Sequence, residues 1–415
     1  MSEWYLDFVD LGYNPSKDDL VCLFRVEPAK GFSMKEAAGR VASESSVGTW
    51  TELAYLPKRI KGLMAKAFEI KGTYVKVAYP IDLWEPANMP QILSGIAGNI
   101  FGMKAVKNLR LEDVNFPKKL VKSFKGPQFG IRGIRKMLKI YDRPLTATVP
   151  KPKVGLSTKE EVEVAYKAWL GGIDLEKSDE NLASMKFNRF EERIKLLIKM
   201  RDKAEKITGE RKSFLPNVTA ETNEMIRRAK FVADNDGEYA MIDIITVGWA
   251  GFQTLREVCQ DLKLAIYCHR AMHAVMDRNL RHGISMLAIA KLTRIIGGDH
   301  LHTGTANIGK LESNEGETEK INEFLQSKFY DVKPVFPVAS GGVHAGLIPN
   351  LIKVLGKDIT IQVGGGIHTL GTEIGAKAIR ESIDATLKNI PLKEYAKTHT
   401  ALRVSLEKLG YVHPK

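Results

Sequence analysis

The chain has 415 residues, which is too long for one ordinary hydrophobic core and predicts two domains, one of them large enough for a barrel of about 250 residues. Hydrophobic residues make up 44% and charged residues 27% of the chain, and no apolar run approaches the roughly 18 residues that a membrane span needs. We therefore expect no membrane partner.

The net charge of +13 raises the question of nucleic-acid binding. Such a function would need a contiguous basic stripe, whereas Lys and Arg alternate with Asp and Glu along the helical stretches, as in MIRRAKFVADNDGE at 225–238. We expect no nucleic-acid partner, and a solvated basic surface that favours a small anionic substrate fits the pattern better.

The cysteines and the N-terminal residues indicate the compartment. Cys22, Cys259 and Cys268 are too few and too scattered for a disulfide framework or a CxxC metal site. The first 20 residues lack a basic start followed by an apolar stretch, so no signal peptide is expected. These features predict a cytoplasmic protein.

The first part of the chain, residues 1–126, has the pattern of an α+β domain. Short β-rich runs at 20–26 and 72–80 alternate with helical patterns at 33–45 and 90–106. The pattern changes at the Lys-Gly-Pro sequence of residues 125–127, and we expect the second domain to comprise residues 127–415.

The second part contains eight short apolar runs separated by long amphipathic helical patterns. The runs lie at 144–153, 172–180, 213–220, 239–247, 264–270, 299–304, 334–340 and 359–366. Eight strands alternating with helices over roughly 290 residues match a (β/α)₈ TIM barrel better than an open doubly wound sheet. The predicted fold class is therefore α/β, with a C-terminal TIM barrel preceded by a smaller α+β N-terminal domain.

Polar residues gather at the carboxyl ends of the predicted strands, where barrel active sites lie. They are Lys151, Lys153, Lys177, Asp179, Glu180, Asn217, His269, Arg270, His302, Ser340 and Gly364 to Gly366. We expect the function to converge at this end of the barrel.

The run GIDLEKSDE carries the most chemistry. In a strand, Lys177 and Asp179 face the same side, and Glu180 can join them at the strand end. Spacing alone favours a satisfied ion pair. The alternative is that the lysine reacts with carbon dioxide to become a carbamate, and three oxygen anions would then suit Mg²⁺.

Glycines follow the last two predicted strands, where TIM barrels place a phosphate site. Gly341 and Gly342 come directly after Ser340, and Gly364 and Gly365 end the eighth run. Bare backbone amides there can approach an anion. The sequence thus predicts a phosphate cradle, although a lone glycine cluster is usually only a turn.

Several motifs together resemble the ribulose-1,5-bisphosphate carboxylase/oxygenase (RuBisCO) large-chain family along almost the whole chain. In the family's order they are ESSVGTW (44–50), GNIFGMKAVKNLRLEDV (98–114), KPKVG (151–155), KSDE (177–180), HRAMH (269–273), GGDHLHTGT (297–305), ASGG (339–342) and VGGG (363–366). One such motif would be weak evidence, but eight in order make accidental similarity untenable.

The resemblance implies roles for the strand-end residues. Lys177 would be carbamylated by an activating carbon dioxide and would bind Mg²⁺ with Asp179 and Glu180. Lys151 would be the general acid and base, with Lys153 beside it. The remaining implied site residues are Arg270 and His302 as a phosphate clamp, His269 beside the reacting intermediate, Lys310 on a closing loop, and Ser340, Gly341, Gly342, Gly364 and Gly365 around the substrate.

The resemblance also implies the reaction and the assembly. The substrates would be ribulose 1,5-bisphosphate with carbon dioxide or oxygen, and carboxylation would give two molecules of 3-phosphoglycerate. Glu44, Thr49, Trp50 and Asn99 of one chain would cap the barrel of a partner, so a homodimer or a ring of dimers is expected, without a small subunit.

The chain departs from the family pattern at a few positions. Ser178 replaces an acidic residue, Tyr267 stands where many members carry a histidine, and the loop before Lys310 is one residue longer than in plant enzymes. These features resemble the archaeal form III branch, which is linked to nucleotide salvage. The alternative is a RuBisCO-like enolase or isomerase acting on a related sugar phosphate, although such proteins typically lose clamp or loop residues that are present here.

Overall fold

The computed structural model describes residues 4–49, 51, 54–310 and 315–411. They form two compact units, which are described separately. Unit 1 comprises Met1–Lys125 and Met272–Ile296, and unit 2 comprises Gly126–Ala271 and Gly297–Lys415. The expected domain boundary at residue 126 stays a prediction, since unit 1 joins two parts of the chain.

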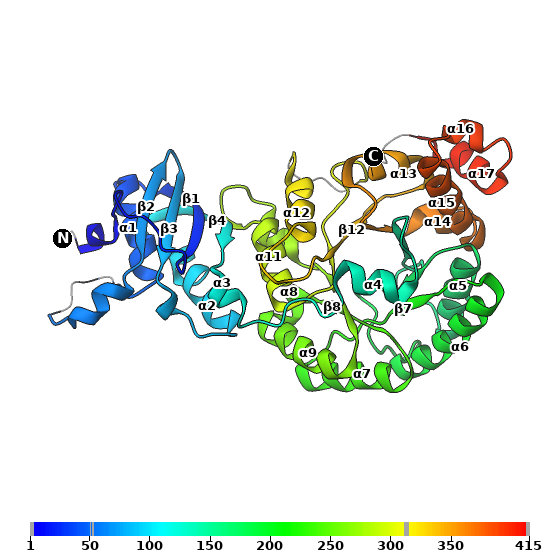
Figure 1. Cartoon of the computed structure of the whole chain (residues 1–415), viewed down its shortest axis with the longest axis horizontal. Helices are drawn as coiled ribbons and strands as arrows, with labels where there is room; N and C mark the ends of the chain where they lie inside the picture. The colour runs from blue at the N-terminus through cyan, green and yellow to red at the C-terminus, as the bar shows by residue number, and fades with distance from the viewer. Residues whose placement is uncertain (1–3, 50, 52–53, 311–314, 412–415) are drawn as a thin grey trace. The chain divides into compact units, whose positions relative to one another are not determined.

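Unit 1 is built on a five-stranded sheet in the order β10-β4-β1-β3-β2. Its strands are β1 (Leu20–Pro28), β2 (Lys66–Lys71), β3 (Tyr74–Tyr79), β4 (Val106–Asn115) and β10 (Gly283–Ile284). The central strand β1 is antiparallel to β3 and β4, and β10 is parallel to β4. Figure 1 labels β1, β2 and β3 in the blue part of the chain and β4 in its cyan part.

The helical segments of unit 1 are short. They are η1 (Trp4–Phe8), α1 (Met34–Glu44), η2 (Lys58–Leu63), η3 (Ile81–Leu83), α2 (Met89–Ile96), η4 (Asn99–Gly102), α3 (Lys118–Val121), α10 (His273–Asp277) and α11 (Met286–Ile296). A capping box between Ser33 and Glu36 begins α1 and satisfies two free amide groups of its first turn. The strand runs at 20–26 and 72–80 and the helix at 33–45 are confirmed.

The prediction of one helical pattern over 90–106 is wrong. Helix α2 ends at Ile96, because at Gly98 the backbone turns so closely that an added Cβ would lie 2.0 Å from the carbonyl oxygen of Ser94. The 3₁₀ turn η4 follows, and strand β4 begins at Val106. The apolar residues of this run therefore belong to three elements, α2, η4 and β4. The periodicity of apolar residues alone does not separate these elements.

Unit 2 is a barrel of parallel strands, as predicted. The strands are β5 (Leu145–Thr148), β6 (Leu175–Lys177), β7 (Ser213–Leu215), β8 (Tyr239–Asp243), β9 (Ala265–His269), β11 (His300–His302), β12 (Phe336–Ser340) and β13 (Thr360–Val363). Their order is β7-β6-β5-β13-β12-β11-β9-β8. Met241 N donates to Pro216 O at 2.9 Å, and Val218 N donates to Met241 O at 3.0 Å, so backbone bonds join the two ends of the ladder.

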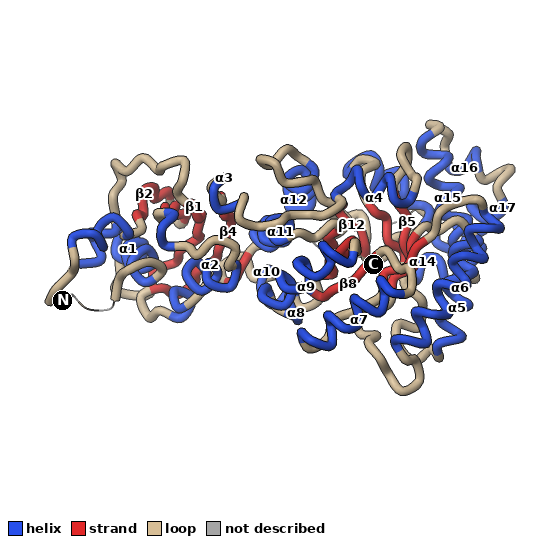
Figure 2. Tube along the Cα trace, turned by 60° about the horizontal axis from the view of Figure 1, so that its bottom comes forward, coloured by secondary structure: helices blue, strands red, loops and turns tan. Residues whose placement is uncertain are grey.

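Helices surround these strands, as Figures 1 and 2 show for α5, α6, α7 and α9. The helical segments of unit 2 are α4 (Gly130–Leu138), α5 (Thr158–Leu170), α6 (Phe190–Thr208), α7 (Thr222–Asp234), α8 (Ile244–Val247), α9 (Trp249–Leu262), α12 (Glu317–Gln326), η5 (Ala345–Leu347), α13 (Ile348–Leu355), α14 (Gly365–His368), α15 (Thr372–Leu387), α16 (Leu392–Tyr395) and α17 (Thr400–Leu409). All eight predicted strands and their alternation with helices are confirmed.

Aromatic rings fill the interior of the barrel. The His300 ring stacks on Phe336 with centroids 5.3 Å apart, and it lies 5.1 Å from Tyr267 and 5.6 Å from Tyr239. All four side chains are fully buried, and burial lowers the pKa of His300 to about 3, so this imidazole is neutral. The rings make a rigid floor beneath the carboxyl ends of the strands.

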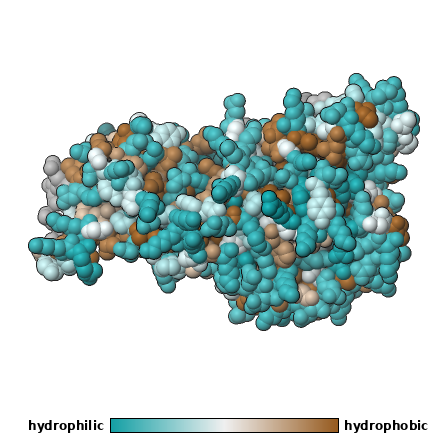
Figure 3. Space-filling view, in the orientation of Figure 1, coloured by the Kyte–Doolittle hydropathy of each residue, from teal (hydrophilic) through white to brown (hydrophobic). Residues whose placement is uncertain are grey.

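The surface agrees with the interleaved charges of the sequence. Figure 3 shows hydrophilic side chains over most of the face in view, with smaller hydrophobic patches between them. In the described part of the chain, no helix has the length and apolar character required to cross a membrane.

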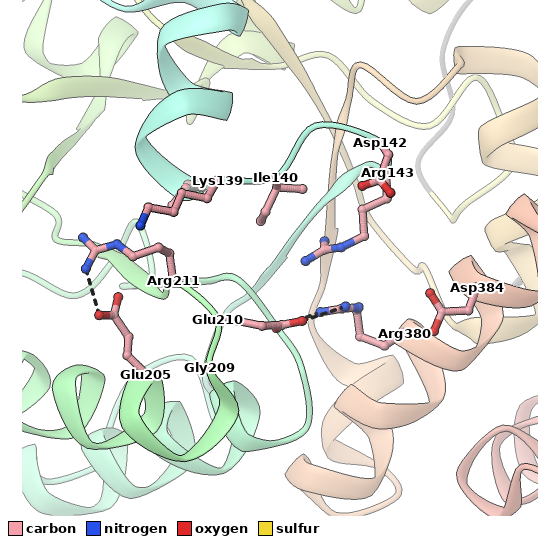
Figure 4. Close-up of a pocket in the computed structure, with 11 residues that line it drawn as sticks. Lys139, Ile140, Asp142, Arg143, Glu205, Gly209, Glu210, Arg211, Arg380 and Asp384 are labelled. Carbon is pink, nitrogen blue, oxygen red and sulfur yellow. Dashed lines mark hydrogen bonds and ion pairs between the residues drawn. The ribbon is translucent and has the colours of Figure 1, made fainter.

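A polar cavity of about 510 Å³ lies where the chain enters β5 and β7 (Figure 4). Its charged side chains are largely paired with one another. Arg211 lies 2.8 Å from Glu205, and Arg380 lies 3.1 Å from Glu210. This end of a TIM barrel generally serves stability, and the paired charges fit a structural role.

Arg143 and Asp174 form the most deeply buried ion pair near this cavity. Two hydrogen bonds of 2.7 Å join the guanidinium to both oxygens of Asp174, which is fully buried. Burial alone would raise the pKa of Asp174, but the adjacent Arg143 outweighs this effect and the pKa is lowered from 3.8 to about 2. The depressed pKa contributes about 2 kcal/mol to stability above pH 4, and this is lost as the pH falls toward 2.

We predict that Arg143→Met lowers the free energy of unfolding by about 3–5 kcal/mol at pH 7, because it leaves Asp174 buried without its partner. The loss should shrink as the pH falls from 4 toward 2 and Asp174 becomes protonated. Guanidinium chloride unfolding followed by circular dichroism measures both effects. The matched control is Arg227→Met, whose half-exposed pair with Glu224 should be worth less than about 1 kcal/mol. Equal losses in the two variants would contradict the prediction.

Candidate active site

A cavity of about 470 Å³ opens at the carboxyl ends of the barrel strands. Its lining comes from six strand ends and the segments after them: Val149, Lys151, Asp179, Glu180, His269, His302, Lys310, Ser340, Gly341, Gly342, Val343, His344, Gln362, Gly364, Gly365, Gly366, Thr369 and Leu409. The cavity therefore lies where the sequence predicts the function to converge.

Two lysine–carboxylate pairs lie at one wall of this cavity. Lys177 Nζ lies 3.1 Å from Glu180 Oε2, and Lys151 Nζ lies 3.2 Å from Asp179 Oδ2. Lys177 is fully buried, whereas the side chain of Lys151 is 35% exposed. The buried Lys177 ammonium thus faces a carboxylate in a place that water hardly reaches. The chemical state of the Lys177 amine is therefore decisive for the site.

The backbone of Asp179 and Glu180 is held in a way that the alternation of side chains along a strand did not predict. Strand β6 ends at Lys177, so the alternation of faces does not extend to Asp179. Instead, the Asn217 amide donates to the carbonyl oxygens of Asp179 and Glu180 at 3.3 and 3.1 Å. Ser178 is buried and does not line the cavity, as expected of a residue pointing away from the site.

The electrostatics of the wall keep Glu180 ionised. Burial would raise the pKa of Glu180, but the charges of Lys177 and His269 oppose this effect and lower the pKa to about 2. An ionised carboxylate at the edge of a cavity is a ligand for a hard cation such as Mg²⁺.

Two histidines on neighbouring strands form the next wall, and their rings are 4.6 Å apart. His269 Nδ1 lies 2.8 Å from the Asp243 carboxylate, which leaves Nε2 facing Glu180 at 3.7 Å. His302 Nδ1 lies 2.9 Å from the Ser340 hydroxyl. Burial first, and then the positive charge of its neighbours, lowers the pKa of His302 well below its ordinary value, so this ring is neutral.

Close backbone contacts shape the opposite side. Lys310 N donates to Gly341 O at 3.0 Å, which joins the segment after β11 to the segment after β12. At Gly309 an added Cβ would lie 2.0 Å from the same carbonyl oxygen, so only glycine allows this approach. The Lys310 segment is thereby held next to the predicted phosphate cradle.

The structure brings most of the predicted residues together. Lys151, Asp179, Glu180, His269, His302, Lys310, Ser340, Gly341, Gly342, Gly364 and Gly365 line the cavity. Lys177 lies behind Glu180, and Lys153 borders a separate small hollow beside Asp179. Arg270 does not line the cavity but directly follows His269 in unit 2.

The predicted N-terminal residues belong to unit 1. Glu44 ends helix α1, Asn99 begins η4, and the Thr49 carbonyl accepts a hydrogen bond from Trp4 Nε1 at 3.1 Å. Trp50 lies outside the described residues. Their predicted role at the barrel of a partner stays a prediction.

Sequence reasoning missed Asp243, which orients the cavity residue His269, and several residues that line the cavity. Asp243 ends the fourth barrel strand and could have been found as a carboxylate at a carboxyl strand end. Gln362 could have been found from its place just before the last glycine run. Val343, His344 and Thr369 follow the strands by several residues, and no local pattern marks them as cavity residues.

The described residues fit Mg²⁺ only with an additional oxygen ligand. No group of three or more His, Cys, Asp and Glu side chains in this part of the chain could hold a metal ion. Asp179 and Glu180 supply two hard carboxylates, and the buried Lys177 amine is the adjacent group that carbon dioxide could convert to an anionic oxygen donor. The donor set is therefore compatible with magnesium after that modification.

The chain has an eight-stranded barrel, and lysines, carboxylates and histidines line a cavity at the carboxyl ends of its strands. These features place the chain in the class of TIM-barrel enzymes. Two family descriptions match the chain: "Ribulose bisphosphate carboxylase large chain, N-terminal domain" over residues 7–120 and "Ribulose bisphosphate carboxylase large chain, catalytic domain" over residues 130–409. The chain belongs to the RuBisCO large-chain family.

Archaeal relatives match over nearly their full lengths. The ribulose bisphosphate carboxylase of Pyrococcus abyssi is 54% identical, with 100% of this chain and 98% of the relative covered. An octameric RuBisCO of Pyrococcus horikoshii OT3, in complex with sulfate ion, has a TM-score of 0.96 at 52% identity, covering 99% of this chain and 98% of the other. A dimeric archaeal RuBisCO from Hyperthermus butylicus has a TM-score of 0.93 at 48% identity, with coverages of 98% and 100%. The predicted family and its archaeal type are confirmed.

Proposed function

We propose that this chain is a ribulose-1,5-bisphosphate carboxylase/oxygenase, a carbon–carbon lyase that enolises its substrate, adds carbon dioxide and cleaves the product to two molecules of 3-phosphoglycerate. The observation that carries the proposal is the paired wall of Lys177 with Glu180 and Lys151 with Asp179, in a chain 54% identical to a named carboxylase. Incorporation of labelled bicarbonate into 3-phosphoglycerate, with ribulose 1,5-bisphosphate and Mg²⁺ supplied, tests it. Absence of labelled product would contradict it.

Lys177 would become a magnesium ligand by reacting with an activating carbon dioxide. The Lys177 ammonium first loses a proton, and the neutral amine then attacks carbon dioxide, forms an N–C bond and releases a second proton, so that a cation is replaced by an anion with two oxygens. Asp179 and Glu180 would complete the protein ligands of Mg²⁺. When bound, Mg²⁺ would polarise the substrate oxygens and stabilise negative charge that develops on them.

The other wall residues would handle protons and charge. Lys151 is partly exposed to the cavity and lies beside Asp179, where its amine could take and return a proton of the substrate. His269, oriented by Asp243, would present Nε2 to the reacting carbon atoms during hydration. Lys310, on the segment held by Gly341, would stabilise the newly formed carboxylate while its loop excludes water.

The cavity would bind both phosphates of the substrate. The glycine amides after β12 and β13, with Ser340, provide donors for one phosphate. His302 Nε2 is buried and has no hydrogen-bond partner among the described residues, so it is available as a donor when Ser340 satisfies Nδ1. Arg270 and His302 would hold the second phosphate, with Lys153 adding positive charge nearby.

The cellular setting follows from the family branch. We infer a cytoplasmic enzyme of nucleotide salvage from this branch alone. The octameric and dimeric archaeal structures support a homodimer or a ring of dimers without a small subunit. Oxygen would compete with carbon dioxide for the same enediolate, which gives the monooxygenase activity implied by the family.

We predict that activity requires preincubation with carbon dioxide and Mg²⁺, because unmodified Lys177 presents a cation where a metal ligand is needed. Lys177→Arg should lose activity by at least about 10³-fold, since a guanidinium cannot form the carbamate. Initial rates with and without preincubation measure the requirement. Full activity of the arginine variant, or rates indifferent to preincubation, would refute the carbamate.

A second prediction separates the roles of two lysines. Lys310→Ala should still exchange the proton on the third carbon of the substrate but fail to fix carbon dioxide, because Lys310 acts after enolisation. Lys151→Ala should lose exchange as well. Tritium release from labelled substrate measures exchange, and equal loss in both variants would contradict this division.

A third prediction concerns the shared site. A Lys177→Ala chain and a Glu44→Gln chain should each be inactive, yet their co-expression should restore roughly a quarter of the wild-type sites, because a mixed dimer has one intact site. Tagged mixed dimers and active-site titration provide the measurement. If purified mixed dimers recover no activity above the single variants, Glu44 does not act across the dimer.

A further inference from the structure

His368 joins the glycine segment after β13 to the end of β5. Its Nε2 lies 2.9 Å from the Val149 carbonyl oxygen, and its Nδ1 lies 3.1 Å from the Thr372 hydroxyl. Val149 is two positions before Lys151. His368 ends the short helix α14, whose first residue is Gly365. The imidazole therefore bridges the segment of the predicted phosphate cradle and the segment that carries the proposed general acid and base.

The partners of His368 determine the tautomer of its ring. A backbone carbonyl only accepts a hydrogen bond, so Nε2 carries the proton and donates it to Val149. Burial lowers the pKa of His368 against the opposing effect of the Val149 bond, and the charge of Lys151 lowers the pKa further. The ring is therefore neutral at pH 7, Nδ1 is an acceptor, and the Thr372 hydroxyl at the start of α15 donates to it.

The segment that carries Lys151 has few backbone donors of its own. Pro150 and Pro152 flank Lys151, and a proline nitrogen carries no proton, so neither can donate a hydrogen bond from its backbone. The ladders that join β5 to β13 and to β6 stop at Thr148. The imidazole bond to Val149 thus extends the attachment of this segment beyond the end of the ladders.

The Lys151 side chain lies against the same glycine segment. At Gly364 an added Cβ would lie 3.3 Å from Lys151 Cε, while Lys151 Nζ lies 3.2 Å from Asp179 Oδ2. A shift of the lysine backbone therefore moves the amine relative to both neighbours. General acid–base catalysis is sensitive to such a shift, because the amine must lie within hydrogen-bond reach of the proton that it takes.

We propose that His368 is a positioning residue, which places Lys151 for proton transfer by holding the Val149 carbonyl. A phosphate bound by the glycine amides at the start of α14 orders this helix, and His368 at the other end of the helix then fixes the lysine backbone. The inference rests on the proposed function and deepens it by naming the residue that couples substrate binding to enolisation.

The test compares proton exchange at saturating substrate with the calorimetric Kd of ribulose 1,5-bisphosphate. His368→Leu should lower the exchange rate constant about tenfold and change Kd by no more than about twofold, because the lysine is displaced while the phosphate donors stay. His368→Gln should keep exchange within about threefold of wild type, since its amide nitrogen can take the place of Nε2. Thr372→Val should lower exchange roughly threefold, because Nδ1 loses the donor that fixes the tautomer.

The matched control is His399→Leu. His399 Nδ1 also lies 2.8 Å from a backbone carbonyl oxygen, that of Tyr395, but this pair lies just before α17 and does not line the cavity. The control should keep proton exchange within about twofold of wild type. Trapping of carbon dioxide on Lys177 should be equal in all variants, because the wall of Lys177 and Glu180 is untouched.

A second measurement reports on Lys151 without catalysis. Asp179 favours the ammonium form of Lys151, which slows reductive ¹³C-methylation of the amine. In His368→Leu, peptide mass spectrometry should show methylation of Lys151 about threefold faster than in wild type, because the amine is no longer held beside the carboxylate. Lys167, which is paired with Glu163 on the surface at 2.7 Å, is the matched lysine and should react at an unchanged rate.

Three results would overturn the inference: exchange in His368→Leu within about twofold of wild type, a loss of exchange that His368→Gln does not restore, or an unchanged methylation rate of Lys151. Threonine and valine are alike in size, so Thr372→Val carries the test if His368→Leu does not fold. A wild-type chain that neither exchanges the proton nor fixes carbon dioxide would refute the proposed function instead, and the methylation rates would still decide whether His368 places Lys151.

Discussion

The site depends on one constraint: a fully buried lysine ammonium lies 3.1 Å from a carboxylate at the end of a barrel strand. A buried charge is costly unless it is compensated, and here Glu180 compensates it. The pair leaves the amine next to Glu180, which lines a cavity of about 470 Å³ together with Asp179. Conversion of that cation to an anion would reverse the local charge and create a place for a divalent metal ion.

The rest of the barrel supports this arrangement. Asn217 holds the backbone of the two carboxylate residues, Asp243 orients His269, and the Lys310 segment is bonded to Gly341. Beneath them, stacked rings around His300 exclude water and keep Tyr267 against Gln362. The reactive side chains at the cavity surface are thus attached to a rigid barrel interior. Barrels position groups from different strands in this way.

Much of this architecture could be predicted from the sequence, because it depends on local patterns. Eight apolar runs with polar ends predict both the barrel and the residues at its mouth, and ordered motifs identify the family. The predicted single helix at 90–106 fails because the backbone of Gly98 turns back onto the carbonyl of Ser94, four residues earlier, and the spacing of apolar residues does not record such a turn. Asp179 is held by Asn217, 38 positions along the chain, and Gln362 is bonded to Tyr267, 95 positions away, so these are long-range contacts that local patterns do not record.

The central claim is that Lys177 reacts with carbon dioxide to complete a magnesium site. The most direct measurement is trapping of the carbamate by methylation after incubation with ¹³C-labelled carbon dioxide and Mg²⁺, followed by peptide mass spectrometry. The account predicts one labelled carboxyl group on Lys177 that depends on Mg²⁺ and is lost in Glu180→Gln. Label on exposed lysines alone, with Lys177 unmodified under conditions of full activity, would contradict it.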